Sequence, residues 1–236
     1  MRFETLMAKG LVVSSMFTTM PATSFANEIN NNIRADFKNS SIEDTIKNAT
    51  IDTWINSITN LPVEFEYYKV EFINGKMYVV GQYYDENHIS VNALYEYNLS
   101  SNSWTKKADV PIPENETFYG FSTVILDNKL YVLGSMMSGS MPNGTFLRYD
   151  PETNQWEKLS DCNLFGGSHP MLEAVNGKIY VFGGSVSIFA SNSVAVYNPQ
   201  DDTWVAKQNM PDMNLSTSSD EEGLHSAVSA VIGDKV

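Results

Sequence analysis

The chain has 236 residues, enough for one large β-rich domain or two small ones at roughly 150 residues per domain. Its 15 Lys and Arg against 28 Asp and Glu give a formal net charge of -13, which excludes nucleic-acid binding and attraction to an anionic membrane as main activities, because both need clustered basic side chains. The single cysteine, Cys162, excludes an internal disulfide and a cysteine-based zinc site.

Residues 1–26 have the pattern of a secretory signal peptide. Arg2 and Lys9 flank an apolar stretch, and small residues at positions 24 and 26 suit cleavage after Ala26. A cytosolic terminus is the alternative, because Ser and Thr interrupt that stretch. We expect a secreted, periplasmic or cell-surface protein in which residues 27–49 form a polar leader or linker. No later apolar run reaches the roughly 18 residues that a membrane-spanning helix needs.

An internal repeat begins near residue 50. Four tryptophans, at positions 54, 104, 156 and 204, are separated by 50, 52 and 48 residues. Residues 74–81, 127–134 and 176–183 align as a tight-turn pair, a lysine, four apolar residues and a glycine. Each copy continues to a strand that ends in tyrosine, seven residues before the tryptophan. The apolar segments 121–125, 171–175 and 226–231 are interpreted as first strands of repeats. Each complete copy therefore supplies four strands.

The recurring aromatic and glycine positions are interpreted as structural. Regular recurrence fits packing between repeats better than a sugar-binding platform, because large aromatics bury extensive area wherever two layers meet. The glycines allow the backbone to approach a neighbour closely. The positions are Tyr78, Gly81, Trp104, Tyr131, Gly134, Trp156, Tyr180, Gly183 and Trp204.

On these motifs, residues 50–236 resemble the kelch-repeat family, although the glycine is doubled only at Gly183-Gly184. The resemblance implies an all-β fold, a β-propeller of kelch-type four-stranded blades. The propeller is expected to be incomplete, with about three full blades plus partial strands at both ends, because propellers have four to eight blades. Trp54 lacks the first three strands of its blade, and residues 225–236 supply only a first strand. We therefore expect a fragment whose missing C-terminal blades close the ring.

Function stays open at this stage, because members of the family are protein-binding modules, carbohydrate-binding modules, copper radical oxidases or sugar mutarotases. An oxidase would need a copper site, but His88, His169 and His225 have no metal-ligand spacing, and Cys162 occupies a position typical of a packed residue. A mutarotase would need an acid, for which Glu173 is a weak candidate, and an arginine. We expect a binding module without cofactor or metal, with a sugar-modifying enzyme as the alternative.

A candidate binding surface follows from the lengths of the connections. The tight turns occupy one end of each blade, so the long connections gather at the other end, here called the long-loop face. These connections are predicted at 82–93, 135–145 and 185–193 within blades, and at 108–118, 160–168 and 209–224 between blades. Exposed aromatics beside carboxylates favour a carbohydrate or protein ligand there, although ordinary loops also carry them. The candidates are Tyr83, Tyr84, Asp85, Glu86, His88, Glu114, Glu116, Phe118, Tyr119, Phe165, Asp220, Glu221 and Glu222.

The 209–224 connection is longer than its counterparts, and its extra residues include Asp220, Glu221 and Glu222. Clustered carboxylates attract cations and basic partners. The alternative is a solvated loop tip without a ligand.

Overall fold

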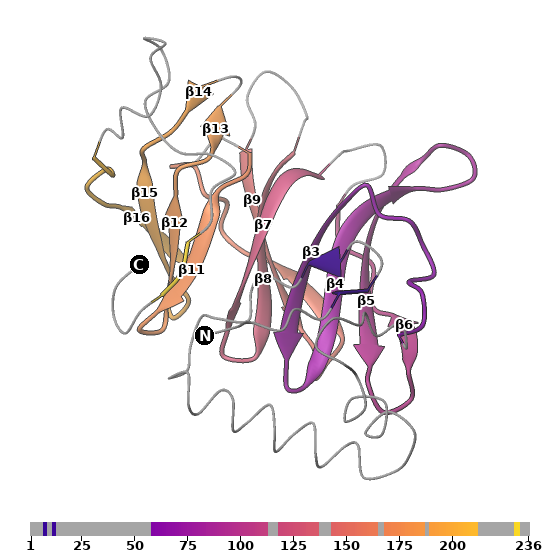
Figure 1. Cartoon of the computed structure of the whole chain (residues 1–236). Coiled ribbons are helices and arrows are strands. Elements are labelled where there is room, and N and C mark those ends of the chain that lie inside the picture. Colours follow the sequence, from indigo (N-terminus) through magenta and orange to yellow (C-terminus); the bar gives the residue numbers. More distant parts are fainter. Residues whose placement is uncertain are drawn as a thin grey trace.

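Three four-stranded antiparallel sheets, the blades, make up the fold in the computed structural model (Figure 1). The structure describes residues 58–112, 118–136, 143–164, 168–186, 189–211 and 229–231, together with two short strands near the N-terminus, and no helix occurs in these ranges. The blades lie side by side without closing into a ring, as expected for an incomplete propeller. Their inner strands β3, β7 and β11 contact one another in that order.

The strand bounds follow the predicted repeat. Blade 1 is β3 (Tyr67–Ile73), β4 (Lys76–Tyr84), β5 (Ser90–Asn98) and β6 (Ser103–Lys106); blade 2 is β7 (Phe118–Leu126), β8 (Lys129–Met136), β9 (Asn143–Asp150) and β10 (Gln155–Lys158). Blade 3 is β11 (Met171–Val175), β12 (Lys178–Phe182), β15 (Val194–Asn198) and β16 (Thr203–Ala206). Two further hairpins are β1 (Met7–Ala8) with β2 (Leu11–Val12), and β13 (Ser185–Val186) with β14 (Phe189–Ala190).

The turn between the first two strands of each blade has the predicted conformation. Asn74 and Gly75 have φ of 51° and 75°, and the pairs at 127–128 and 176–177 also have positive φ at both positions. Two consecutive positive φ values match the twist of a two-residue hairpin, and Asn, Asp and Gly tolerate them best. These turns therefore fix the register of the first two strands in every blade.

The core lies between blades. On β4, Tyr78 and Val80 face blade 2 and pack in one cluster with Leu130, Val132 and Tyr149. The equivalent residues of blade 2 form a second cluster with Ile179, Val181 and Tyr197 of blade 3. The second strands of blades 1 and 2 are buried on both faces, which explains their unbroken apolar runs, whereas Tyr180 and Phe182 on the second strand of blade 3 are half-buried.

Two of the repeat glycines permit close packing. A Cβ atom at Gly81 would lie 2.6 Å from Phe65 Cδ1, and one at Gly134 would lie 2.6 Å from Phe118 Cε2. A side chain at either position would force neighbouring atoms to shift, so both glycines allow the close approach that the sequence predicts.

Each blade also holds one residue of the segment that leads into its first strand. In blade 2, Asn154 Oδ1 accepts hydrogen bonds from Ala108 N–H (3.0 Å) and Tyr149 O–H (2.8 Å), while Trp156 Nε1 donates to Ala108 O (3.0 Å). Blade 1 holds Thr59, and blade 3 holds Ser160, in the same way. In each blade, the Tyr, the Asn or Asp, and the Trp that make these hydrogen bonds are here called the blade clamp. The three clamps are Tyr97, Asn102 and Trp104; Tyr149, Asn154 and Trp156; and Tyr197, Asp202 and Trp204.

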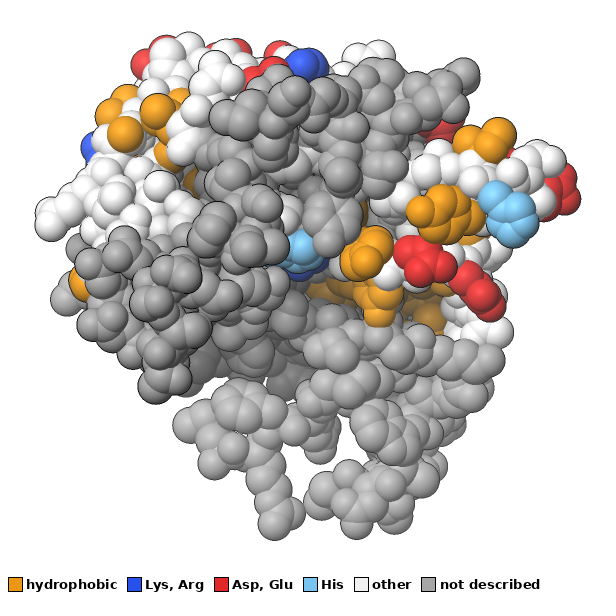
Figure 2. Space-filling view, turned by 90° about the horizontal axis from the view of Figure 1, so that it is seen from above, with side chains coloured by type: hydrophobic (Ala, Val, Ile, Leu, Met, Phe, Trp, Pro, Cys, Tyr) orange, Lys and Arg blue, Asp and Glu red, His pale blue; other side chains and the backbone are white. Residues whose placement is uncertain are grey.

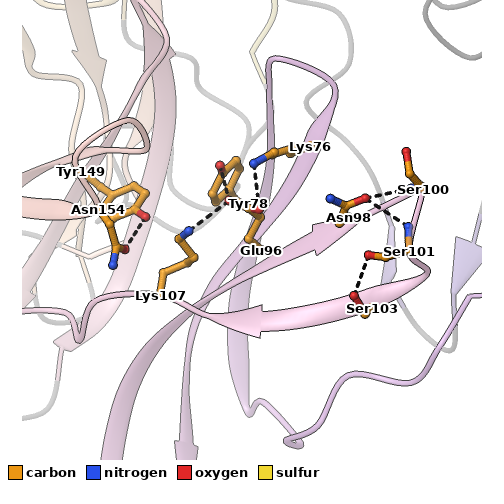
Figure 3. A network of polar contacts seen from close by, with 10 residues as sticks. All are labelled: Lys76, Tyr78, Glu96, Asn98, Ser100, Ser101, Ser103, Lys107, Tyr149 and Asn154. Atoms are coloured by element: carbon orange, nitrogen blue, oxygen red, sulfur yellow. Dashed lines mark hydrogen bonds and ion pairs between the residues drawn. The ribbon is translucent and has the colours of Figure 1, made fainter. Parts of the chain in front are cut away.

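A buried polar cluster occupies blade 1 where it meets blade 2 (Figure 3). Tyr78 O–H donates to Glu96 Oε2 (2.7 Å), and Lys76 Nζ and Lys107 Nζ lie 3.0 and 3.3 Å from the Glu96 carboxylate. Burial opposes ionisation of Glu96, but these hydrogen bonds outweigh it and lower its pKa. Burial, and in second place the same hydrogen bond to Glu96, raise the pKa of Tyr78. The cluster therefore holds a carboxylate anion and a neutral phenol.

The predicted connections differ from the observed ones at three places. Strands β4 and β5 run on past residue 81 and leave only residues 85–89 as a turn, because Gln82 and Asn92 still pair. Strands β8 and β9 similarly leave residues 137–142. Phe118, predicted on an exposed loop, lies in β7 and is buried, with its ring stacked on Phe121 at 5.4 Å. The space above Gly134 accommodates that ring, which removes Phe118 from the exposed candidates.

Candidate functional site: the long-loop face

The β4–β5 hairpin forms the best-described part of the long-loop face. Asp85 closes its tip, because Asp85 Oδ1 accepts hydrogen bonds from the N–H groups of Asn87 and Ile89, both at 2.8 Å. The backbone N–H of Asp85 also donates to Ile89 O (3.0 Å), and that of His88 donates to Asp85 O (3.0 Å). The hydrogen bond from Ile89 is the main reason that the pKa of Asp85 is lowered. The tip is therefore a closed turn carrying an anion.

Alternation along β4 separates the two predicted tyrosines. Tyr83 turns inward and packs edge-on against Phe65, with ring centroids 5.9 Å apart. Tyr84 points to the opposite side and exposes 53% of its surface, and Ile89 in the turn exposes 52%. Glu86 and His88 are also exposed. Figure 2, which looks down on this face, shows hydrophobic, acidic and histidine side chains gathered on one projecting part of the surface.

Sequence reasoning did not single out Tyr67 and Ile89. Tyr67 pairs with Gln82 across β3 and β4, so it lies on the same side of the sheet as Tyr84, and it is exposed by 52%. Continuing the repeat alignment into the first strand of blade 1 would have identified Tyr67. Ile89 has no such repeat signal, because the turn between β4 and β5 differs in each copy.

The junction of blades 2 and 3 forms a second part of this face. His169 has φ of 56°, and its N–H donates to Gly120 O at 2.6 Å, beside a bulge in β7 between Tyr119 and Ser122. Ser122 Oγ donates to Pro170 O (2.6 Å). Bulges and positive φ at a non-glycine residue both occur often near functional sites. Here they join the start of β11 firmly to β7.

The inner strands carry buried carboxylates. Thr123 Oγ1 donates to Glu71 Oε1 (2.6 Å) across blades 1 and 2. Glu173 on β11 is 3% exposed and hydrogen-bonds Ser229, while its Oε2 atom has no hydrogen-bond partner. Burial raises the pKa of Glu173. The described residues show no contact between Glu173 and Arg148, which instead forms an ion pair with Glu157.

Several candidates cannot be placed. Tyr119 lies in β7 opposite Ser135, and only its backbone is described. The remaining loop candidates, including the acidic part of the 209–224 connection, lie outside the described residues and stay predictions. They are Glu114, Glu116, Phe165, Asp220, Glu221 and Glu222.

The part of the chain that the structure describes contains no group of three or more His, Cys, Asp or Glu side chains that could hold a metal ion. Cys162 is fully buried with Leu159, Phe146 and Leu172 in the cluster between blades 2 and 3. The interpretation of Cys162 as a packed residue is thus confirmed. No helix of the described residues is long and apolar enough to cross a membrane.

A family model, the KLHDC2/KLHL20/DRC7 Kelch-repeats domain, matches residues 61–236. The chain belongs to the kelch-repeat family. Its curated relatives include Kelch repeat and BTB domain-containing protein 12 of Danio rerio, 32% identical over 148 residues, which are 56% of this chain and 22% of that protein. Kelch-like protein 15 of Homo sapiens is 31% identical over 155 residues, 56% of this chain and 24% of that protein.

This kelch-repeat chain therefore spans less than a quarter of either relative. Among solved structures it is similar to one titled "Structure of YjhT", with a TM-score of 0.62, 17% identity and coverage of 79% of this chain and 62% of that one. The likeness shows the fold alone. Together, the family match and the fold confirm the kelch-type propeller blades.

Proposed function

We propose that this kelch-repeat chain is a protein-binding module whose partner docks on the long-loop face over the β4–β5 hairpin. The observation that carries the proposal is the pair Tyr84 and Ile89, each exposed by about half on a hairpin tip that its own hydrogen bonds close. Apolar side chains on a rigid element lose little entropy on binding and are typical anchors of protein interfaces. Family membership supports the proposal, because kelch-repeat domains generally mediate interactions between proteins.

The charges of the hairpin define the chemistry of the partner. Asp85 and Glu86 stand beside the apolar pair, and the whole chain has a net charge of -13. The proposed partner presents an apolar side chain flanked by Lys or Arg. Opposite charge would raise the association rate, and added salt would lower it.

The test compares three forms of the full chain. Partners captured by the immobilised wild-type chain are identified, and the affinity of each is measured separately by calorimetry. The double variant Tyr84→Ala, Ile89→Ser should bind at least about tenfold more weakly. The control Val205→Ser changes an equally exposed apolar residue on β16, away from this face, and should bind like wild type.

Equal affinity of the double variant and wild type would refute the proposed surface. Carbohydrate binding, the other ligand class that the sequence suggests, is tested with the same three proteins on a glycan array. A glycan that binds the wild-type chain but not the double variant would show that the ligand of this surface is a carbohydrate and not a protein.

Secretion is also part of our proposal and rests on the signal-peptide pattern of residues 1–26. Expression of the full-length coding sequence followed by N-terminal sequencing of exported protein should give Asn27 as the first residue. Intact Met1 in the cell and no exported form would contradict it.

A further inference from the structure

The outer edge of blade 3 differs in charge from the outer edges of blades 1 and 2. Strand β16 is an edge strand of its sheet, as β6 and β10 are of theirs. The last residue of β6 is Lys106 and that of β10 is Lys158, and each forms an ion pair with an aspartate three residues later. The last residue of β16 is Ala206, and β16 contains no charged residue. Charged side chains, lysine above all, keep an edge strand from pairing with another chain, so β16 lacks a protection that the other two edges have.

The main chain of β16 presents groups that can pair with a further strand. The N–H of Lys207 donates to Val194 O (2.8 Å), on the side of β15. Because main-chain groups alternate in direction along a strand, the N–H and C=O groups of Trp204 and Ala206 point away from β15. The side chain of Val205, between them, is 51% exposed. This edge is therefore open to a fifth strand.

Opposite charges stand at the two ends of this edge. At its start, Thr203 Oγ1 donates a 2.6 Å hydrogen bond to Asp201 Oδ1, which holds the carboxylate beside Thr203. That hydrogen bond is the main reason that the pKa of Asp201 is lowered. At the other end, Lys207 is exposed and forms no ion pair within the described part of the chain. An edge that is negative at one end and positive at the other is complementary to itself in the antiparallel direction.

We propose that the β16 edge is a docking surface for the β16 edge of a second copy of this chain, paired antiparallel about a twofold axis at Val205. In this register Trp204 lies opposite Ala206 of the other copy, and each such pair exchanges two N–H···O bonds through its outward groups. Val205 faces Val205 of the other copy, and Lys207 faces the Asp201 carboxylate. The occupant follows from this charge complementarity. A shift by one residue is excluded, because it would place outward groups opposite groups that already bond to β15.

The interface is separate from the long-loop face. Strand β16 belongs to blade 3, whereas the β4–β5 hairpin belongs to blade 1, so either proposal can fail alone. Because only a short edge is shared, we expect a weak dimer that forms as the concentration rises.

The first test changes the end charges of the full 236-residue chain. Sedimentation equilibrium should show dimerisation of wild type. Lys207→Glu places acids opposite acids, and Asp201→Lys places bases opposite bases, so each variant should dimerise at least about tenfold more weakly. An equimolar mixture of the two should form heterodimers at least as readily as wild type forms homodimers, because every acid again meets a lysine.

The matched control is Lys178→Glu, the same change of charge at an exposed lysine of β12, which should dimerise like wild type. Equal association of Lys207→Glu and Lys178→Glu, or a mixture that associates no better than its components, would overturn the proposal. A wild-type chain that stays monomeric at every concentration would also overturn it.

The second test measures the register. Facing residues of a pair without hydrogen bonds have Cα atoms about 4.5 Å apart, within the range of a disulfide. Two Val205→Cys chains should therefore form a covalent dimer when oxidised glutathione accepts two electrons and two protons from their thiols and leaves as two molecules of reduced glutathione. Thr105→Cys, at the equivalent exposed position of β6, should stay monomeric, and the native Cys162 is fully buried. Equal cross-linking of the two variants would overturn the proposed register.

Discussion

Trp156 Nε1 donates a 3.0 Å hydrogen bond to the main-chain oxygen of Ala108, 48 residues earlier in the chain. The bond ties the outer strand of blade 2 to the connection that leaves blade 1, and it recurs in the other two blades. We expect Trp156→Phe to keep most of the ring packing and to leave the Ala108 carbonyl without its donor. The free energy of unfolding should fall by about 1–3 kcal/mol in urea denaturation. Val205→Thr, at an exposed strand position, is the control, and an equal loss in both variants would contradict the role of the bond.

Glu96→Gln tests the buried polar cluster. At pH 7 the variant should lose about 1–3 kcal/mol of stability, because the amide cannot replace the charge that faces Lys76 and Lys107. The pKa of Glu96 in the folded chain lies below the ordinary glutamate value of 4.5, so this stabilisation is complete above that value and disappears as the pH falls through the folded pKa. Denaturation at pH 7 and pH 3 should show the difference between variant and wild type shrinking in acid. Glu157→Gln, in an exposed pair with Arg148, should change stability by less than about 1 kcal/mol.

Glu173→Gln should change stability in the opposite direction to Glu96→Gln, because the pKa of Glu173 is raised by burial and that of Glu96 is lowered. The folded pKa of Glu173 lies above 4.5, so between these values the folded chain binds more protons than the unfolded chain, and stability falls as the pH rises through that interval. The variant retains an acceptor for Ser229 and should be more stable than wild type at pH 7, by about 1 kcal/mol, with no gain at pH 4. Denaturant titrations at both pH values measure this. A gain of the same size at both would mean that ionisation is not its cause.

Gly134→Ala and Gly75→Ala separate crowding from backbone strain. A Cβ at Gly134 would lie 2.6 Å from the buried Phe118 ring, whereas Gly75, at φ of 75°, has open space around it. We expect Gly134→Ala to lower the melting temperature more, at a cost of about 1–3 kcal/mol or above, against about 1 kcal/mol for Gly75→Ala. A larger loss at Gly75 would show that the turn, and not the packing beside β8, limits stability.

The sequence by itself determined the repeat, the four strands of each blade, the hairpin turns and the position of the clamp tryptophans. These features depend on neighbouring residues: Asn74-Gly75 suits its turn whatever surrounds it, and the interval of seven residues between Tyr149 and Trp156 is set within one hairpin.

Only the tertiary structure decided which aromatic side chains are exposed and what each blade interface contains. Tyr83 and Tyr84 are adjacent in the sequence, yet one packs on Phe65 and the other is exposed. Tyr84 is the last residue of β4 and lies beyond Tyr78 and Val80, the part of the same side that packs against blade 2. Phe118 is buried because the surface of Gly134 leaves space for its ring. Glu96 and Arg148 occupy the same register position in successive blades, yet Glu96 pairs with Lys76 and Lys107 whereas Arg148 pairs with Glu157, and the repeat pattern does not specify these different partners.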